Sequence, residues 1–291
     1  GRGGLLRPIT GGVYTISQAM LDDLASERYG SHPCNLGAPL ALLFAAESGC
    51  PAFIVDPPVT DELDEAARLT GLPEVRRRSV FHALSQRGAA RTAARRLGVR
   101  YEQSGFIVAH LGGGISIGAH RQGQVVDVLN ALDGEGPFSP ERAGRLPALP
   151  LLAMLERGEA DILELRKRIL TRGGLFAHLG SNDLREVEAR IDAGDAGAAL
   201  VFEALARGIA RDVASLAPLF ALPDSGPCGA LDLHAVVVTG GMARSLRLQE
   251  TLRARLAFLA PVITVTGLEE MEALADGARL ALTEEVEIRE Y

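Results

Sequence analysis

Cysteine is scarce in this sequence of 291 residues, where only Cys34, Cys50 and Cys228 are present. Three scattered cysteines are too few for a metal cluster, and their odd number does not suit a disulfide framework. Long apolar runs are also missing, because the longest, residues 36–46, contains Pro39 and is well short of the roughly 20 residues that a membrane-spanning helix needs. We therefore expect a cytoplasmic protein with no membrane partner.

Lysine is almost absent, since Lys167 is the only one, and the 30 basic residues are outnumbered by 37 acidic ones. The formal net charge of -7 argues against a nucleic-acid partner, because phosphate backbones are bound by basic surfaces. A hydrophobic content of 47% is sufficient to fill two cores in a chain of this length, so we expect two domains.

Three short β-branched runs are separated by turns that contain glycine. They predict a meander of adjacent strands at residues 106–110, 115–119 and 124–129. The first turn is Gly112-Gly113-Gly114, where three residues without a Cβ let the backbone approach a ligand and direct N–H groups at it. A phosphate would suit this turn, although a plain tight turn is the commoner explanation of a glycine tripeptide by itself.

A long loop rich in glycine and proline, residues 133–144, follows the third strand. A compact domain seldom keeps an irregular loop of this length without a use for it. The loop presents Arg142, which can give two parallel hydrogen bonds to a phosphoryl or carboxylate group. Further along, a strand, Gly240-Gly241 and a helix through residue 256 form a second arrangement that can bring N–H groups and a positive helix end to a nucleotide, although many α/β turns of this form bind no ligand.

Hydrophobic spacing and capping residues predict the other elements. Helices are expected at residues 17–24, 35–48, 61–69, 84–97, 149–156, 161–170, 196–220 and 269–282, and one more is expected after the cap at 181–183. Strands are expected at residues 52–55, 235–239 and 262–265. The 35–48 helix is expected to be buried. We place the domain boundary in the polar connector after residue 98, so that one domain spans 1–104 and the other 105–291, with the last helix (about 270–291) packing back on the first domain.

Several separated motifs resemble those of the acetokinase family, and their residues are most similar to those of its butyrate kinase branch. They are RGGLL, FHALSQ, HLGGGISIGAH, VVDVLNALDGEGPFSPERAG and VVVTGGMARS. The resemblance runs along the whole sequence and implies an α/β fold of two actin-like (ribonuclease H-like) domains, from the superfamily of acetate and sugar kinases, heat-shock ATPases and actin. Family members begin with a strand and an Asn-Pro-Gly-Ser-Thr-like phosphate loop that this sequence does not contain. We therefore expect the first domain to be incomplete.

The resemblance also implies which residues act on the acid. Arg2 matches the arginine that pairs with the carboxylate or acyl phosphate, and a frayed terminus is its alternative. His32 matches a histidine near the acyl pocket, with a capping or packing role as its alternative. His82 matches the histidine that donates a hydrogen bond to the phosphoryl group in flight, and Arg142 supplies positive charge there. Asp56 matches an aspartate that helps to hold the metal and reaction centre, and a turn residue before two prolines is its alternative.

Three segments are implied to bind the nucleotide. They contain His110, Gly112, Gly113 and Gly114, then Asp183, Leu184 and Arg185, then Gly240, Gly241, Met242 and Ala243. Helix capping by itself explains Asn182 and Asp183 equally well. For the metal, Mg²⁺, the resemblance implies Asp56 together with a glutamate in the last helix. We assign that glutamate as Glu270, although spacing does not separate it from Glu269 or Glu272.

The implied reaction is ATP-dependent phosphorylation of a short-chain carboxylic acid, butanoate or a branched-chain acid, to an acyl phosphate and ADP. The acid is already deprotonated at neutral pH, so it needs no strong general base. The difficulty is to bring two anions together, which arginines, a histidine donor, Mg²⁺ and backbone N–H groups would ease. Acetate or propionate kinase activity and a catalytically inactive nucleotide-binding fragment remain alternatives. The resemblance further implies a homodimer or a higher homo-oligomer.

Overall fold

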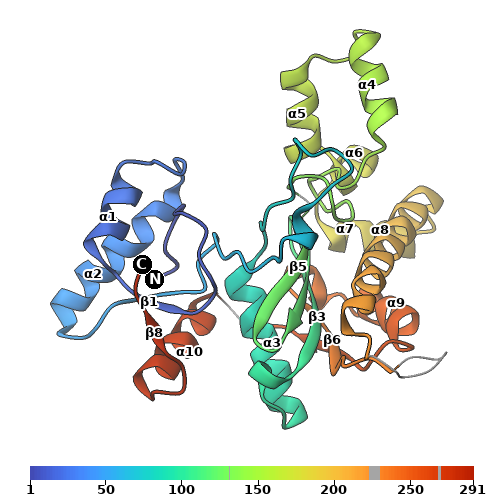
Figure 1. The fold of residues 1–291 in the computed structure, drawn as a ribbon. Helices are drawn as coiled ribbons and strands as arrows, with labels where there is room; N and C mark the ends of the chain where they lie inside the picture. The colour runs from blue at the N-terminus through green and yellow to red at the C-terminus, as the bar shows by residue number, and fades with distance from the viewer. Residues whose placement is uncertain (131, 223–229, 268–269) are drawn as a thin grey trace.

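The computed structural model describes residues 1–130, 132–222, 230–267 and 270–291, which form two separate sheets (Figure 1). The smaller sheet has the strand order β2-β1-β8, and the larger sheet has the order β5-β4-β3-β6-β7. The strands are β1 (Val13–Thr15), β2 (Phe53–Val55), β3 (Gly105–Leu111), β4 (Ile115–Arg121), β5 (Gln124–Asn130), β6 (Ala235–Thr239), β7 (Val262–Val265) and β8 (Ile288–Arg289).

The predicted meander is present in the larger sheet. β3, β4 and β5 pair antiparallel in chain order, while β6 and β7 continue the sheet parallel to β3. β6 is buried along its whole length, as β3 is except at His110, because helices cover both faces of the sheet. This sheet therefore forms the rigid base from which the glycine turn after β3 projects.

The helices are α1 (Gln18–Ala25), α2 (Gly37–Ser48), α3 (Ala83–Leu97), α4 (Ala148–Glu156), α5 (Ile162–Thr171), α6 (Gly174–Leu179), α7 (Leu184–Asp192), α8 (Ala196–Ser215), α9 (Leu246–Leu256) and α10 (Glu270–Leu282). Short 3-10 helices are η1 (Pro33–Leu36), η2 (Ala66–Arg68), η3 (Tyr101–Gln103), η4 (Ala217–Phe220) and η5 (Gly241–Arg244). α8 and α9 pack on one face of the larger sheet, and α3 packs on the other. The α4–α5 hairpin projects away from the sheets (Figure 1).

The helix predicted at residues 61–69 is wrong, because only the η2 turn forms there. Asp61 Oδ1 instead accepts a hydrogen bond from the Leu63 N–H at 3.2 Å, and Asp64 Oδ1 accepts one from the Ala67 N–H at 2.7 Å. Such local side-chain bonds offer the backbone an alternative to the helical ladder. These acidic residues thus bind N–H groups around a single 3-10 turn, where the prediction had a long helix.

Three other helix predictions need correction. α8 ends at Ser215, with Pro218 in the following η4, because proline supplies no N–H to continue the ladder. The turn after β6 leads into η5, and the Ser245 hydroxyl then caps a separate helix, α9. α2 is not buried as predicted, since Phe44 is 63% exposed and only Ala38 and Ala45 are buried.

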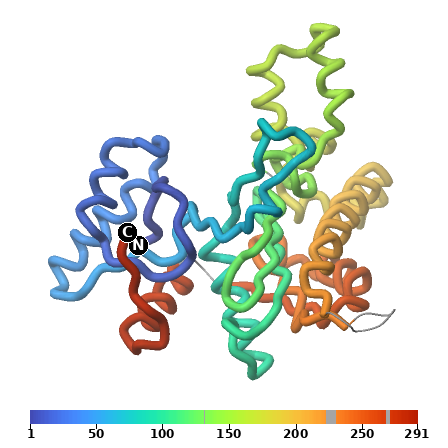
Figure 2. The backbone as a smooth tube through the Cα atoms, in the orientation of Figure 1, coloured from blue at the N-terminus to red at the C-terminus, as the bar shows by residue number. Residues whose placement is uncertain are grey.

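The end of the chain returns to the smaller sheet. β8 pairs parallel with β1, and Ala273 and Ala281 of α10 join a cluster with Val13, Phe53 and Val55. Figure 2 shows this last segment, in red, beside the N-terminal segment in blue. α3, which the predicted division placed in the first domain, packs on the larger sheet through its alanine face.

Candidate active site

Two histidine rings stack at the start of α3 and the end of β3. The ring centroids of His82 and His110 are 3.9 Å apart and the planes differ by 14°. Burial lowers the pKa of His82 well below its usual value, and the positive charges of Arg142 and Arg2 add to this effect. Burial, with a smaller contribution from Arg2, lowers the pKa of His110 to about 4. Both rings are therefore neutral at pH 7, and two guanidinium groups act on them.

The glycine turn and the arginine loop form one unit. Ser139 Oγ donates a hydrogen bond to the Gly113 carbonyl at 2.6 Å and accepts one from the Arg142 N–H at 3.1 Å. A Cβ at Gly114 would lie 2.5 Å from Arg142 Nη1, so only glycine admits the guanidinium at this distance. Within the described residues no carboxylate pairs with Arg142. The loop thus places beside the turn predicted to hold phosphate a guanidinium that no described carboxylate neutralises.

A cavity of about 760 Å³ opens beside this turn, and each of the three predicted nucleotide segments contributes to its wall. Among the predicted residues, its lining contains Gly112, Gly113, Asp183, Leu184, Arg185, Gly241 and Met242. Asp183 caps α7 by accepting the Arg185 N–H at 2.9 Å, so the capping interpretation holds at the same time. The structure therefore brings together segments that lie more than a hundred residues apart in the sequence.

His110, Gly114, Gly240 and Ala243 are outside that lining. Gly240 has φ +93°, and a Cβ on it would lie 2.4 Å from the Leu111 carbonyl oxygen. Its missing side chain lets the turn after β6 pack directly on the end of β3. Ala243 is buried in the core of the larger sheet. Gly240 and Ala243 therefore contribute to the cavity through packing and not as part of its lining.

Asp56 is buried at the end of β2, where both of its carboxylate oxygens meet protein cations. Arg87 Nε lies 2.8 Å from Oδ1, and Arg91 Nη1 lies 2.9 Å from Oδ2. The Gly12 N–H also donates to Oδ1 at 2.9 Å. Glu62 joins this cluster through Arg87 at 3.0 Å. The structure thus places Asp56 in an ion cluster between the two sheets, and its predicted role in catalysis and metal binding stays a prediction.

The other predicted acid-side and metal residues have different outcomes. His32 Nδ1 accepts the Cys34 N–H at 3.1 Å and caps η1, which is the capping alternative, while its role at the acyl pocket stays a prediction. Arg2 is half-buried and acts electrostatically on both histidines. Glu269 and the side chain of Glu270 lie outside the described residues. Glu272 is exposed on α10.

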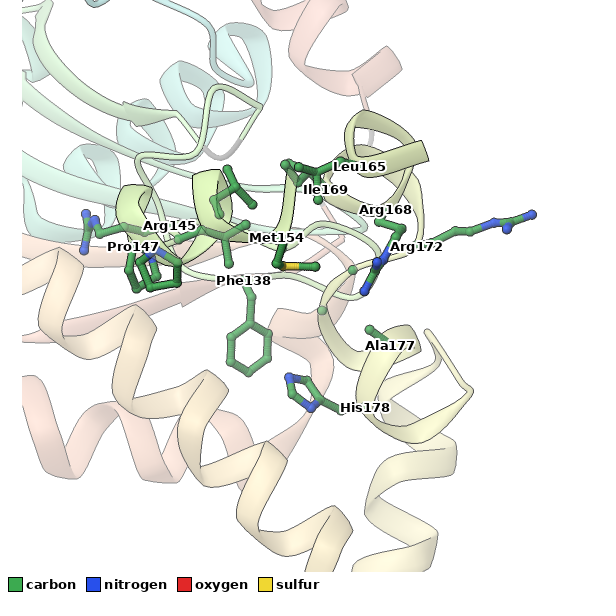
Figure 3. Close-up of a pocket in the computed structure, with 16 residues that line it drawn as sticks. Phe138, Arg145, Pro147, Met154, Leu165, Arg168, Ile169, Arg172, Ala177 and His178 are labelled. Atoms are coloured by element: carbon green, nitrogen blue, oxygen red, sulfur yellow. The ribbon is translucent and has the colours of Figure 1, made fainter. Parts of the chain in front are cut away.

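A second cavity, of about 390 Å³, lies between the α4–α5 hairpin and the far side of the arginine loop (Figure 3). Its wall is largely apolar, and Figure 3 shows Phe138, Met154 and His178 around it. The Phe138 and His178 ring centroids are 6.0 Å apart. No predicted site residue lines this cavity, so we do not regard it as the reaction site.

The sequence reasoning missed the residues that hold the two histidines. Ser116 Oγ lies 2.8 Å from His82 Nδ1, and Ser85 Oγ lies 2.8 Å from His110 Nδ1. Ser116 stands inside the motif HLGGGISIGAH, where a hydroxyl within a buried apolar strand is itself a signal of a polar partner. Nothing in the local pattern points to Ser85, whose partner lies on another element.

Comparisons with known proteins show the family of this chain. The family described as "Acetokinase family" matches residues 70–259. Proteins named "Probable butyrate kinase" from Oleidesulfovibrio alaskensis and Maridesulfovibrio salexigens are 55% and 53% identical over 100% of this chain and 79% of their own length.

Two solved structures have a similar fold. The Porphyromonas gingivalis acetate kinase has a TM-score of 0.76 at 21% identity, covering 93% of this chain and 75% of that one. The acetate kinase of Entamoeba histolytica has a TM-score of 0.72 at 16% identity, covering 95% of this chain and 78% of its own. The predicted α/β fold with actin-like domains is thereby confirmed.

Proposed function

The chain belongs to the acetokinase family, and we propose that it transfers the γ-phosphoryl group of ATP to the carboxylate of a short-chain acid, with butanoate as the preferred substrate. Membership supports an ATP-dependent carboxylate kinase, and the names of the most similar relatives support butanoate. The observation that carries the proposal is the meeting of Arg142, two neutral histidines and the glycine turn, whose Gly112 and Gly113 line the 760 Å³ cavity.

The reaction requires positive charge and hydrogen-bond donors. A carboxylate oxygen forms a bond to the γ-phosphorus while the bond to the β,γ-bridging oxygen breaks, so that acyl phosphate and ADP result. No proton has to be removed, because the acid is already ionised at pH 7. Arg142 and Arg2 would offset the repulsion between the two anions, and a neutral histidine N–H would bind the transferring group without adding a charge.

The structure favours an acid over an alcohol as acceptor. A sugar kinase needs a carboxylate that accepts the proton of the attacking hydroxyl. Within the described residues no carboxylate pairs with either stacked histidine or with Arg142, and both oxygens of Asp56 are already bound to arginines. A carboxylate acceptor needs no base, so it fits this set of contacts.

We propose Mg²⁺ as the metal, brought in by ATP itself. Mg²⁺ keeps several waters in nucleotide sites and is held by one or two carboxylates plus phosphate oxygens. Among the described residues no group of three His, Cys, Asp or Glu side chains could hold a metal, and Asp56 is engaged by two arginines. The described residues thus do not form a ready metal site, and we derive no step through the ion.

The remaining expectations concern partners. No described helix is long and apolar enough to cross a bilayer. The homo-oligomer implied by the sequence motifs stays a prediction. Acetate or propionate as the preferred acid, and ATP binding without phosphoryl transfer, are the alternative functions that an assay must separate.

The test is acyl-phosphate formation, trapped with hydroxylamine, from ATP, Mg²⁺ and acids from acetate to isovalerate. It is run on this chain, with ADP release without acid as the control. We expect kcat/KM to be highest for four- and five-carbon acids. A maximum at acetate or propionate would contradict the preference. ATP binding with no phosphorylation of any acid would contradict the carboxylate kinase itself.

A further inference from the structure

A line of buried polar side chains runs from His82 into the protein, away from the predicted substrate side. Ser116 Oγ lies 2.8 Å from His82 Nδ1, and Gln86 Nε2 lies 2.9 Å from the same Ser116 oxygen. Gln86 Oε1 lies 3.0 Å from His120 Nε2, and His120 Nδ1 lies 2.9 Å from the Tyr101 hydroxyl. All four residues beyond His82 are buried. A fully hydrogen-bonded buried chain of this kind restricts its members to one arrangement.

The orientation of the Gln86 amide follows from the Ser116 carbonyl. This backbone oxygen can only accept, and it lies 3.0 Å from the Gln86 atom assigned as Nε2. The amide nitrogen must therefore face Ser116, and Oε1 must face His120. Because Oε1 can only accept, His120 Nε2 carries a hydrogen. Burial lowers the pKa of His120 well below its usual value, so its Nδ1 is bare and accepts the Tyr101 hydroxyl.

The same reasoning decides which nitrogen of His82 carries hydrogen. A serine hydroxyl has two acceptor positions and one hydrogen to donate. Ser116 Oγ accepts from Gln86 Nε2 at 2.9 Å and from the His82 backbone N–H at 3.3 Å, which occupies both acceptor positions. Its own hydrogen remains for His82 Nδ1 at 2.8 Å. Since the ring is neutral, its hydrogen is on Nε2, at the opposite edge.

We propose that Ser116, Gln86 and His120 are positioning residues that hold His82 in its Nε2–H tautomer, so that the only ring donor faces the phosphoryl group beside Arg142. The identity of the group that Nε2 meets rests on the proposed function. The tautomer follows from the hydrogen bonds alone. A ring with its hydrogen on Nδ1 would present a lone pair to the anionic phosphoryl group, and that contact is repulsive.

The first test observes the tautomer directly and does not depend on an activity measurement. Nitrogen NMR of protein labelled with ¹⁵N-histidine distinguishes a protonated ring nitrogen from a bare one, and the His82 signals are those missing from His82→Asn. We expect His82 to be Nε2–H at pH 7. In Ser116→Ala we expect Nδ1–H or a mixture, and in Ser116→Thr a return to Nε2–H because the hydroxyl is restored.

Ser104→Ala is the matched control for these variants. Its buried hydroxyl donates to the Arg100 carbonyl at 2.7 Å and is not part of the chain that ends at His82. We expect the His82 signals of this variant to match those of the wild type. An Nδ1–H ring in the wild type, or an unchanged tautomer in folded Ser116→Ala, overturns the proposal.

The kinetic test separates this inference from the proposed function. We expect Ser116→Ala to lose roughly ten- to a hundredfold in kcat, less than loss of a whole transition-state donor costs, with KM for ATP unchanged and Ser116→Thr restoring activity. An active wild type whose Ser116→Ala variant keeps full kcat contradicts the positioning role. A wild type that phosphorylates no acid contradicts the proposed function, while the NMR result still decides the tautomer.

Discussion

Arg87 and Arg142 are both held in place by the protein, but their electrostatic surroundings are opposite. Arg87 is buried on α3 between Asp56 at 2.8 Å and Glu62 at 3.0 Å. Arg142 is half-buried on a loop, beside two neutral histidines and a glycine turn, with no carboxylate partner among the described residues.

The difference follows from what each guanidinium must bind. A buried charge needs a protein partner, because its desolvation penalty is otherwise several kcal/mol. Arg87 meets this requirement inside the fold and thereby joins the two sheets. Arg142 lies on the loop whose Pro140 and Glu141 line a cavity, so that water or an anionic ligand can take the partner's place. Pairing therefore distinguishes the structural Arg87 from the proposed ligand-binding Arg142 in a chain with 28 other basic residues.

The largest effect on stability is expected from replacing Arg87, the arginine that pairs with two carboxylates. Arg87→Met would leave Asp56 and Glu62 buried without their shared cation, and we expect the free energy of unfolding to fall by about 3–5 kcal/mol. Urea denaturation measures this loss. Arg95→Met, on the same helix and in an exposed pair with Asp276, should cost at most about 1 kcal/mol. Equal losses in the two variants would contradict the structural role of the cluster.

Removing Arg142, which has no carboxylate partner among the described residues, should instead lower activity and leave stability nearly unchanged. We expect Arg142→Ala to lower kcat for acyl-phosphate formation by about 10²- to 10³-fold, because it removes a charge that stabilises the transition state. Its melting temperature should stay near that of the wild type, since no carboxylate in the described part of the chain loses a partner. Arg166→Ala, at an exposed position on α5, is the control and should keep full activity. A large drop in melting temperature without a loss of kcat would contradict the ligand-binding role of Arg142.

Because of the histidines beside Arg142, the free energy of unfolding should depend on pH. The pKa of His110 is about 4 in the folded protein and near 6.5 when unfolded, so below pH 6.5 the unfolded chain binds more protons. Stability is therefore fully present above pH 6.5 and falls as the pH drops towards 4, by about 3 kcal/mol for this group. Urea denaturation between pH 7 and pH 4.5 should show a shallower decline in His110→Gln. An identical slope in the variant would contradict the lowered pKa.

The smallest effect on stability is expected where a buried carboxylate pairs with arginines that are themselves partly exposed. Asp212 is buried, but its Oδ1 pairs with two partly exposed arginines, Arg145 at 2.9 Å and Arg211 at 3.0 Å. Arg145→Ala should therefore cost only about 1 kcal/mol, because Arg211 remains. The double variant should cost about 3 kcal/mol or more, since it leaves the carboxylate unpaired. Additive losses in urea denaturation would show that the two arginines do not substitute for each other.

Much of the fold was predictable because its signals are local. β6 and β7 lie within their predicted bounds, and the meander strands differ from theirs by only one or two residues. The predicted helix at residues 61–69 failed for a reason that is also local, since aspartates can bind nearby N–H groups in place of a helical ladder. The short β1 and β8 were missed, because a strand of two or three residues has too little alternation to be recognised.

The sequence alone determined most of the strands, the glycine turns and the motifs that identify the family, because each depends on residues that are neighbours in the chain. Tertiary structure alone decided which residues meet. His82 stacks on His110, Asp56 is bound by Arg87 and Arg91, and Ser116 reaches His82 Nδ1. These contacts join residues that lie 28 to 35 positions apart, and only the packing of α3 between the two sheets brings them within hydrogen-bonding distance.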